Sequence, residues 1–578
     1  MTNTLDNIEL NSPTIESDIK TADYDSLALL CSKIRQVIVK ETAKNGGHLS
    51  SNLGVVELTV ALHRNFDFPK DKLILDVGHQ SYAHKLLTGR SLERLGKKDG
   101  VSEFQSQKES PYDPYSAGHS STSISAAEGF ALVRDQKKED YHVVALIGDA
   151  SIMNGLAFEA LNHLSYTKSK VIVVINDNDM SITPAIGGLS NFGKSLANLF
   201  IGMGYLYEGP IDGHNLRVLD EAISVAKKAD RSVILHVKTK KGKGYAPAEA
   251  DNFGYWHASS PFDVETGKPL DMHPDMISWS HLFADIAEMI LAKNENADLI
   301  VPATLKGSNL DGCFARFPER TFDVGIAEEH ALTLASAMSI AGAHPIVTIY
   351  STFLQRAYDE IIHDCARQKV NMTVFIDRAG FTGMTGETHN GIYDVAYLMS
   401  IPGVVITMPS TRNEAVGLAE ESLRGHGVFF VRCPREYLPK GETQAESVPF
   451  GRWKFVDESE DKNIALVAIG PDGLDLYNKL KAKGISLTYV NPIYLNSFDD
   501  EDVAKLLGYK TILAYDSYST ESGFASKFGA VLMEKGYKGK YIVKAIKDAF
   551  IPHMSIKEQK SLFGLNPDEM LDFIENNL

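Results

Sequence analysis

The sequence is poor in cysteine, has no long hydrophobic run and carries no excess of positive charge. Only four cysteines occur among 578 residues, at positions 31, 313, 365 and 433, and their spacing matches no metal-binding pattern. Such usage predicts buried thiols in a protein of a reducing compartment. No run reaches the roughly 18 consecutive apolar residues of a membrane-spanning helix, so the chain is not expected to cross a membrane.

The charge balance is acidic. Lysine and arginine together number 58, aspartate and glutamate number 75, and the net charge is −17. This balance argues against a nucleic-acid partner, because binding to phosphate backbones depends on clustered positive charge. A polyanionic small molecule would have to be held by local cations, a metal ion or backbone N–H groups.

The N-terminal segment, MTNTLDNIELNSPTIESD, is polar and acidic. It lacks the basic start and apolar core of a signal peptide, and it lacks the arginine-rich bias of a transit peptide. We therefore expect a cytoplasmic protein in which residues 1–22 form a disordered or loosely attached leader.

Length and apolar patterning predict several α/β domains, since 578 residues exceed a single hydrophobic core. Continuous apolar runs alternate with helical stretches, which is typical of parallel sheets covered on both faces. The runs form three series, at 73–77, 143–147, 171–175 and 232–237; at 321–326, 344–350, 371–377, 404–409 and 428–434; and at 463–470, 485–490, 511–516 and 541–546. We predict three doubly wound parallel-sheet domains, at residues 1–270, 271–443 and 444–578, with a linker at 261–278.

A carboxylate and an amide follow two predicted strands that are one helix apart. Asp149 comes just after the run at 143–147, and Asn178 follows the run at 171–175. The strands of one βαβ unit end on the same rim of the sheet, where such sheets bind ligands. Asp149 and Asn178 are therefore expected to converge.

These oxygen atoms suit a magnesium ion. Asp149, Asn178 and the Met180 carbonyl would leave positions of an octahedral Mg²⁺ open for phosphate oxygens. The small residues Ala150 and Ser151 would let backbone N–H groups approach a phosphate at the helix start. The alternative is a plain strand-to-helix turn with a polar cap.

The stretch 145–182 resembles the thiamine diphosphate motif, in which Gly-Asp-Gly is followed by a spacer and Asn. Ala150 replaces the third glycine here, which is a mild departure because alanine is also small. Over most of residues 40–440 the chain resembles the 1-deoxy-D-xylulose-5-phosphate synthase family, which is related to transketolase. The matching segments are 46–63, 76–90, 116–129, 238–249, 326–331, 349–360 and 376–383, and the last third of the chain matches more loosely.

The resemblance implies a transketolase-like fold, thiamine diphosphate and Mg²⁺ as cofactors, and a homodimer. It implies condensation of pyruvate with D-glyceraldehyde 3-phosphate and release of CO₂, the first step of non-mevalonate isoprenoid synthesis, with a link to thiamine synthesis. The first domain would hold the diphosphate and the second the pyrimidine ring.

Site residues carry over one by one. The metal ligands would be Asp149, Asn178 and Met180. The residues lining thiamine diphosphate would be His79, Gly118, His119, Ser120, Ala150, Ser151, Asn178, Tyr245, Glu328, Phe353 and Arg356. Glu328 would bind the aminopyrimidine and act in catalysis, although without the resemblance it reads as an acidic residue favouring a helix start.

Other residues are expected to face the substrates. Arg378 and Arg435 each follow a predicted strand, and guanidinium groups suit the acceptor phosphate. Tyr350 would bind substrate from the wall that it shares with Phe353 and Arg356, near the pyrimidine ring. The resemblance also places His48, His257 and His389 near the reacting carbons, where they would move protons.

The basic run at 238–243 offers a second way to meet an anion in this acidic chain. It is short and lacks interleaved aromatic residues, so a nucleic-acid patch is the weaker interpretation. We interpret it as a local positive field for the cofactor or substrate.

Three features depart from the family. The segment 181–213 lacks most of a long insertion that relatives carry, Thr385 stands where the family usually has Asp, and Glu436 follows Arg435 where it usually has Gly. Thr385 puts the acceptor step in question, and Glu436 could weaken the field of Arg435. The sequence therefore leaves two alternatives open: a transketolase-like enzyme with another donor or acceptor, and a non-catalytic regulatory paralogue.

Overall fold

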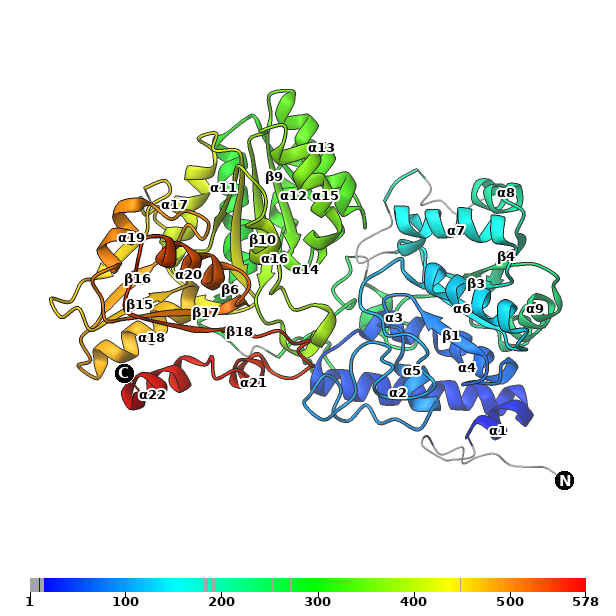
Figure 1. Ribbon diagram of the computed structural model, residues 1–578. Coiled ribbons are helices and arrows are strands. Elements are labelled where there is room, and N and C mark those ends of the chain that lie inside the picture. The colour runs from blue at the N-terminus through cyan, green and yellow to red at the C-terminus, as the bar shows by residue number, and fades with distance from the viewer. Residues whose placement is uncertain are drawn as a thin grey trace. The chain divides into compact units, whose positions relative to one another are not determined.

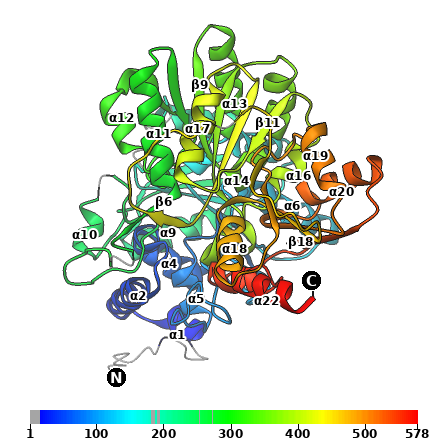
Figure 2. The same cartoon turned by 90° about the vertical axis from the view of Figure 1, so that its left-hand side faces the viewer.

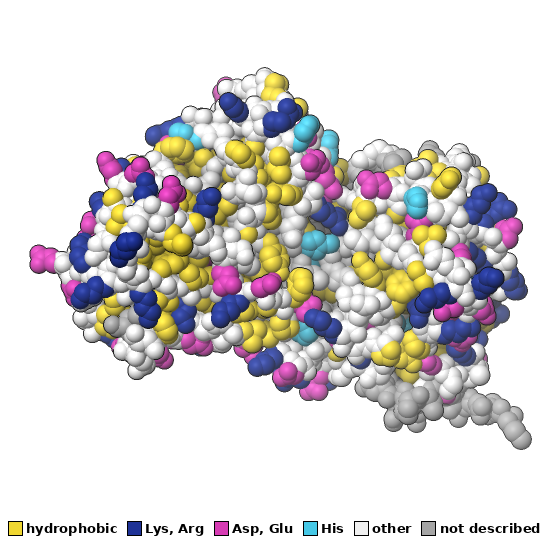
Figure 3. Space-filling view, in the orientation of Figure 1, with side chains coloured by type: hydrophobic (Ala, Val, Ile, Leu, Met, Phe, Trp, Pro, Cys, Tyr) yellow, Lys and Arg dark blue, Asp and Glu magenta, His cyan; other side chains and the backbone are white. Residues whose placement is uncertain are grey.

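A computed structural model describes residues 10, 15–180, 186–188, 194–251, 253–270, 273–447 and 449–577. The chain forms two compact units, residues 1–272 with 325–327 and residues 273–324 with 328–578 (Figure 1). No helix among the described residues is long and apolar enough to cross a bilayer. On the face shown in Figure 3, acidic and basic side chains are mixed over each unit. The shortened segment 181–213 falls partly outside the described residues.

One parallel sheet organises the first unit. Its order is β1-β2-β3-β5-β4, and every neighbouring pair is parallel. The strands are β1 (Lys72–Leu75), β2 (Val143–Gly148), β3 (Ile172–Asp177), β4 (Leu206–Asp212) and β5 (Val233–Lys238). The helices are α1 (Ile15–Thr21), α2 (Tyr24–Asn45), α3 (Leu49–Gly54), α4 (Val56–Asn65), α5 (Tyr82–Leu87), α6 (Ser123–Lys137), η1 (Ser151–Met153), α7 (Gly155–Thr167), α8 (Lys194–Gly202), α9 (Leu216–Lys228) and α10 (Ala246–Glu249).

Both faces of this sheet are buried. Leu75 and Leu146 pack in a core with the helices α2, α4 and α9, while Ile74 and Ala145 pack in a second core with α6 and α7. Successive strand residues point to opposite faces, so a strand covered on both sides must be apolar throughout. This explains the continuous apolar runs and confirms the doubly wound class.

The predicted loose leader is wrong for residues 15–21. These residues form α1, which packs against α4, and Ile19 is 0% exposed. Burying such a side chain stabilises the folded chain by about 1.5–3 kcal/mol, which is enough to dock a short helix of otherwise polar sequence. Residues 1–9 and 11–14 lie outside the described residues.

A six-stranded parallel sheet begins the second unit. Its order is β11-β12-β10-β9-β7-β8. The strands are β7 (Ala297–Val301), β8 (Thr321–Asp323), β9 (His344–Tyr350), β10 (Met372–Ala379), β11 (Val404–Thr407) and β12 (Val428–Pro434), and the separate pair β6 (Met276–Ser278) and β13 (Tyr437–Pro439) is antiparallel. The helical segments are α11 (Trp279–Lys293), α12 (Asp311–Arg316), η2 (Pro318–Arg320), α13 (Glu328–Ile340), α14 (Ser351–Leu354), η3 (Gln355–Ala357), α15 (Tyr358–Glu360), η4 (Ile361–Ala366), η5 (Gly383–Thr388), α16 (Asp394–Leu398) and α17 (Arg412–Ser422).

A five-stranded sheet follows, in the order β14-β16-β15-β17-β18. All its neighbouring pairs are parallel except β14 with β16. The strands are β14 (Lys454–Asp457), β15 (Ile464–Ala468), β16 (Thr488–Asn491), β17 (Thr511–Thr520) and β18 (Lys540–Ile546), and the helices are α18 (Gly470–Ala482), α19 (Asp500–Leu506), α20 (Phe524–Glu534), α21 (Ile556–Ser561) and α22 (Pro567–Asn577).

The two sheets of the second unit share a hydrophobic core. Val374 and Ile406 of the first sheet belong to the same buried cluster as Val467 and Ile512 of the other. On the opposite face of the six-stranded sheet, α11 and α17 lie side by side (Figure 2). The shared core explains why two sheets form one compact unit, and the predicted boundaries at 270/271 and 443/444 stay predictions.

The predicted linker at 261–278 is more ordered than its composition suggests. Phe262 is buried against Trp256, with ring centroids 4.7 Å apart, and residues 276–278 pair with β13. One aromatic anchor and a three-residue strand leave no periodicity in the sequence, which is why the pattern predicted a loop.

Arg432 of β12 forms a buried ion pair with Asp394 of α16 and also bonds β17 of the other sheet of the second unit. Arg432 of β12 is 0% exposed. Its Nε donates to Asp394 Oδ2 at 2.7 Å, and its Nη2 donates to Asp394 Oδ1 at 3.0 Å and to the Tyr518 carbonyl at 3.0 Å. A bidentate pair with a further carbonyl acceptor compensates much of the cost of burying both charges.

We therefore predict that Asp394→Ala destabilises the second unit strongly. The substitution leaves a buried guanidinium without its counter-charge, which costs about 3–5 kcal/mol. The urea midpoint of unfolding should fall clearly below that of the wild type. The control is Asp500→Ala, which removes an exposed partner of Lys535 and should change the midpoint little. Equal midpoints for the two variants would contradict the assignment.

Candidate functional site

The polar clusters of the first unit meet at one rim of its sheet. β2 and β3 are parallel neighbours, and Gly148 pairs with Asn176 at their carboxyl ends. The Asp149 N–H donates to the Asn176 carbonyl at 3.2 Å. The sequence prediction that Asp149 and Asn178 converge is therefore confirmed.

Asp149 is a buried carboxylate held by backbone donors. Asp149 is 2% exposed. The Ala150 N–H donates to Oδ1 at 2.9 Å, and the N–H groups of Asn178 and Met180 donate to Oδ2 at 3.2 Å each. Burial, with Asp177 as a second cause, raises the pKa of Asp149 to about 7. Removal from water thus outweighs three hydrogen bonds.

The donor set fits a magnesium ion. Asn178 Oδ1 lies 3.2 Å from the same Met180 N–H, so the amide and carboxylate oxygens face one point. Among the described residues, no cluster of three or more His, Cys, Asp or Glu side chains could hold a metal. A cation here would therefore need an amide, a carbonyl and ligand oxygens beside Asp149, which suits Mg²⁺. A divalent charge would also stabilise the ionised carboxylate.

Asp177, the last residue of β3, is held by a chain of hydrogen bonds. His236 Nε2 lies 2.6 Å from Asp177 Oδ2, and Tyr207 OH lies 2.6 Å from His236 Nδ1. Lys238 Nζ bonds Asp177 Oδ1 at 3.1 Å. These contacts lower the pKa of Asp177 despite its burial, so it stays ionised and holds the turn rigid.

Three of the predicted histidines form one cluster. The ring centroids of His48, His79 and His257 lie 5.2, 5.4 and 5.6 Å apart in pairs. Burial lowers the pKa of His79 and of His257 well below 6.5, so both rings are neutral near pH 7. Within the described residues their Nδ1 atoms have no hydrogen-bond partner. Two neutral rings thus present polar atoms for which a ligand would supply partners.

The predicted loop of Gly118, His119 and Ser120 is tied to the rim. The next residue, Ser121, donates its hydroxyl to the Ser151 carbonyl at 2.8 Å, and its N–H donates to Asp76 Oδ1 at 2.7 Å. The loop therefore lies beside the turn that carries Ala150 and Ser151.

Sequence reasoning missed a role for Lys241. It saw a basic run but singled out no member. Lys241 is 9% exposed, and burial lowers its pKa to about 8, against an opposing effect of Asp149. Its charge also lowers the pKa of His257. A lysine at the centre of a basic run cannot be recognised as buried without the fold.

Tyr245 lies in an aromatic core. Its ring centroid is 5.5 Å from that of Trp256 and 5.9 Å from that of Phe262, and its hydroxyl donates to the Val264 carbonyl at 3.0 Å. The described contacts link Tyr245 to these residues rather than to the histidine cluster, so its predicted cofactor contact stays a prediction.

Glu328 opens α13 in the second unit, as the sequence predicted. It is 4% exposed, and Arg356 Nη1 lies 3.9 Å from its Oε2. No described residue hydrogen-bonds that oxygen. Burial raises the pKa of Glu328 to about 7, although the Arg356 charge opposes the rise. Glu328 is thus a buried acid with an oxygen that a ligand could bind.

The other predicted residues of this unit adjoin one another. Phe353 stacks on Tyr350 at 5.5 Å and meets the His389 ring edge-on at 5.6 Å. The Arg378 guanidinium lies 3.9 Å from the Tyr350 ring centre. Burial raises the pKa of Tyr350 to about 12, with Arg378 and Arg435 opposing. These side chains therefore form one contiguous group of contacts.

Arg378 and Arg435 reach the same rim from neighbouring strands. β10 and β12 pair in parallel, and Ala379 lies opposite Pro434. Arg435 Nη1 donates to the Thr382 carbonyl at 2.6 Å and lies 3.4 Å from Thr385 Oγ1. The prediction that both arginines sit at strand ends is confirmed.

Family models match three stretches of the chain. Residues 275–440 match "Transketolase, pyrimidine binding domain" and residues 451–570 match "Transketolase, C-terminal domain". Residues 10–197 and 193–239 match the model of 1-deoxy-D-xylulose-5-phosphate synthase. The fold is thus that of the transketolase class of α/β proteins.

Curated relatives narrow the class. A 1-deoxy-D-xylulose-5-phosphate synthase of Geobacillus sp. is 39% identical over 96% of this chain and 97% of its own length. One of Listeria monocytogenes is 39% identical over 97% and 95%. A solved transketolase of Campylobacter jejuni aligns with 96% of this chain and 100% of its own, at 16% identity and a TM-score of 0.46. The chain belongs to the 1-deoxy-D-xylulose-5-phosphate synthase family.

The raised pKa of Glu328 predicts that the stability of the ligand-free protein falls as pH increases. The folded protein binds this proton more tightly than the unfolded chain, since its pKa rises from 4.5 to about 7. Stability of the ligand-free protein is therefore lost as pH increases between these values. Glu328→Gln removes that loss and should stabilise the protein by about 2–3 kcal/mol at pH 8 but little at pH 4.5.

Urea midpoints without cofactor at the two pH values measure this effect. The neighbouring Glu329→Gln, in a less buried residue, is the control and should show no such difference. A Glu328→Gln gain that is equal at both pH values would contradict the prediction.

Proposed function

We propose that the protein condenses pyruvate with D-glyceraldehyde 3-phosphate to give 1-deoxy-D-xylulose 5-phosphate and CO₂. Membership of the synthase family over nearly the whole chain supports this reaction. In the structure, the observation that most directly supports this reaction is the environment of Glu328. This residue is a buried acid with one oxygen that no described residue hydrogen-bonds. A scaffold that had lost catalysis would have no reason to keep so costly a group.

The reaction breaks the bond between the carboxylate and the keto carbon of pyruvate and forms a new bond to the aldehyde carbon. One proton is taken up. Thiamine diphosphate, when bound, supplies the electron sink for this chemistry. Glu328 would bind the aminopyrimidine, where a pKa of about 7 lets it hold or release a proton at working pH.

The rim of the first unit would hold the diphosphate end. Asp149, Asn178 and the Met180 carbonyl would bind Mg²⁺, and backbone N–H groups near Ser151 would meet phosphate oxygens. Lys241 adds a cation close to Asp149. Local charges would thus bind a polyanion although the chain as a whole has a net charge of −17.

The remaining groups would orient the substrates. Arg378 and Arg435 would bind the acceptor phosphate, because guanidinium groups contact phosphate oxygens in pairs. The neutral rings of His79 and His257 would donate or accept single hydrogen bonds rather than carry charge. We propose catalytic proton transfer for His48, His257 and His389.

We also propose the predicted three-domain division, a homodimer and a cytoplasmic location. The family resemblance supports the first two. The location is supported by four buried free cysteines, which suit a reducing compartment.

A product assay tests the function directly. The purified protein with thiamine diphosphate and Mg²⁺ should release CO₂ from pyruvate at a rate that increases with D-glyceraldehyde 3-phosphate, and deoxyxylulose phosphate should form in equal amount. No such product at saturating substrates would overturn the proposal. A ketose phosphate that outperforms pyruvate would identify a transketolase-like enzyme instead.

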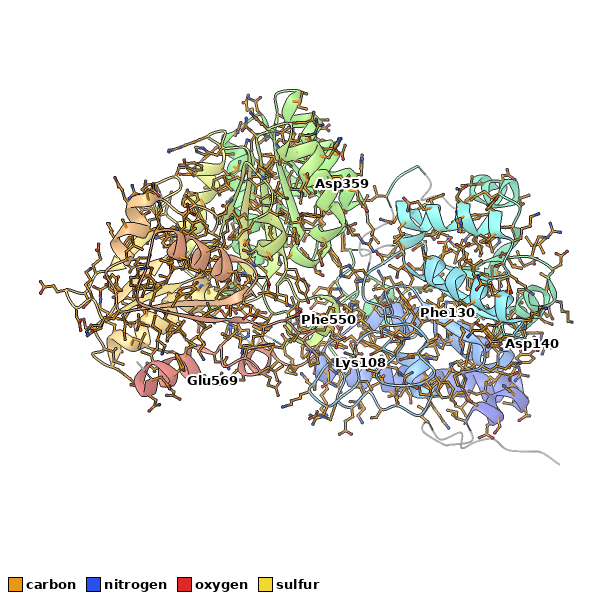
Figure 4. All side chains as sticks on the ribbon, viewed as in Figure 1. Lys108, Phe130, Asp140, Asp359, Phe550 and Glu569 are labelled. Atoms are coloured by element: carbon orange, nitrogen blue, oxygen red, sulfur yellow. The ribbon has the colours of Figure 1, made fainter. Side chains whose placement is uncertain are left out.

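Asp149→Ala should remove the metal-dependent part of cofactor affinity. We expect calorimetry with Mg²⁺ to show at least about 100-fold weaker binding of thiamine diphosphate, because losing a metal ligand exceeds the 10- to 100-fold loss of an outer-shell partner. Asp140→Ala, an exposed carboxylate labelled in Figure 4, is the control and should bind as the wild type. Unchanged affinity of Asp149→Ala would refute the metal assignment.

A further inference from the structure

The segment 551–560 packs along the loop that carries Thr385 and His389. It follows the exposed Phe550, labelled in Figure 4. Gln559 is 0% exposed. Its Oε1 accepts from the Gly383 N–H at 2.8 Å, and its Nε2 donates to the Gly383 carbonyl at 3.2 Å. One side-chain amide thus satisfies both backbone groups of a loop glycine.

Close approach makes this contact specific. At Gly383, which has a φ of +76°, a Cβ atom would lie 3.3 Å from Ile556 Cγ1. At Gly386, with a φ of +58°, it would lie 3.0 Å from the His553 backbone nitrogen. The positive φ at both positions favours glycine, and the short distances leave little room for a Cβ atom. Asn390 Nδ2 adds a bond to the Ile551 carbonyl at 3.2 Å, so the loop is fastened along its length.

The next residue, Lys560, contacts two carboxylates instead of the loop. Its Nζ lies 2.6 Å from Glu436 Oε1 and 2.6 Å from Asp472 Oδ2. Tyr518 OH donates to the second Glu436 oxygen at 3.3 Å. Lys560 is 6% exposed, so its charge is neutralised by two carboxylates in a setting that water screens poorly.

Arg435 is connected both to the loop residue that Gln559 binds and to the carboxylate that Lys560 binds. It precedes Glu436 in the chain, and its Nη1 donates to the carbonyl of Thr382, the residue before Gly383. Gln559 therefore fixes the acceptor of the Arg435 hydrogen bond, and Lys560 fixes the backbone beside Arg435 itself. Two adjacent residues of one short helix hold both ends of this contact.

We infer that Gln559 and Lys560 are positioning residues for the acceptor-phosphate site, holding Arg435 and the 382–390 loop in register; the inference rests on the proposed function of Arg435. Lys560 also answers the concern about Glu436. The Glu436 carboxylate is paired with Lys560 at 2.6 Å, so its negative charge is compensated within that pair.

The test compares phosphorylated and unphosphorylated acceptors. Lys560→Met and Gln559→Leu should raise KM for D-glyceraldehyde 3-phosphate by about tenfold, the cost of misplacing one charge-assisted contact. KM for pyruvate and kcat/KM for unphosphorylated D-glyceraldehyde should change less than about twofold. Arg435→Ala should show the same pattern. Lys557→Met, an exposed lysine of the same helix, is the matched control and should behave as the wild type.

Rescue separates charge placement from loss of packing. Lys560→Arg keeps the cation and should restore KM to within about threefold. Glu436→Gln combined with Lys560→Met removes a carboxylate together with its cation and should recover part of the loss. Equal effects of Lys560→Met on both acceptors, or a fall in kcat with unchanged KM, would overturn the inference. Gln559→Leu provides an independent measurement should Lys560→Met fail to fold.

Titration with inorganic phosphate, followed by calorimetry on the cofactor-loaded protein, separates this inference from the proposed reaction. Weaker phosphate binding in Lys560→Met than in Lys557→Met supports the positioning role even if no deoxyxylulose phosphate forms. Equal affinities in these two variants would refute it even if the wild type makes the expected product.

Discussion

The hydrogen-bonded ladder between parallel strands is the constraint on which the candidate site residues of each unit depend. Parallel pairing sends the carboxyl ends of all strands to one rim. It brings Asp149 and Asn178 together although a whole helix separates them, because Gly148 pairs with Asn176. It likewise brings Arg378 beside Arg435 through the pairing of β10 with β12. Side-chain geometry at each rim is therefore a consequence of backbone register.

Burial that outweighs the available partners distinguishes the carboxylates proposed to bind ligands, Glu328 and Asp149, from Asp394 and Asp177. Asp394 is as buried as Glu328, yet it meets Arg432 through two hydrogen bonds. Glu328 faces its arginine only at 3.9 Å, and its pKa rises to about 7. Where burial wins over partners, the chain carries an energetic cost that a bound ligand can repay. The same reasoning separates Asp149 from Asp177, which has His236 and Lys238 as partners.

Sequence reasoning predicted the parts of the fold that periodicity encodes. The long buried strands were recognised because both of their faces are apolar. β4 and β14 were missed, since most of their residues are only partly buried or exposed and they lie at sheet edges. α1 was missed because two buried isoleucines in a polar segment give too weak a signal. Edge strands and docked terminal helices depend on tertiary contacts, which no local pattern contains.

The candidate site shows the same limit. The places of Asp149 and the two arginines at strand ends, and of Glu328 at a helix start, could be predicted from the pattern, whereas the expected role of Glu328 came from the family resemblance. Lys241 could not be singled out from its basic run, because burial rather than residue type sets it apart. The partner of Glu436 could not be foreseen either. Lys560 lies 124 positions away, and only the packing of α21 brings the two together.

Thr385 and Glu436 both affect the surroundings of Arg435, and their contacts are best considered together. Thr385 places a hydroxyl 3.4 Å from Arg435 Nη1, and Glu436 is the next residue after Arg435 in the chain. Arg435 Nη1 also donates to the Thr382 carbonyl, and the Glu436 carboxylate is paired with Lys560. The carboxylate that follows Arg435 in the chain is thus compensated by a lysine. Under the proposed function, a phosphate would meet a guanidinium whose position these contacts fix, so neither Thr385 nor Glu436 by itself argues against a phosphorylated acceptor.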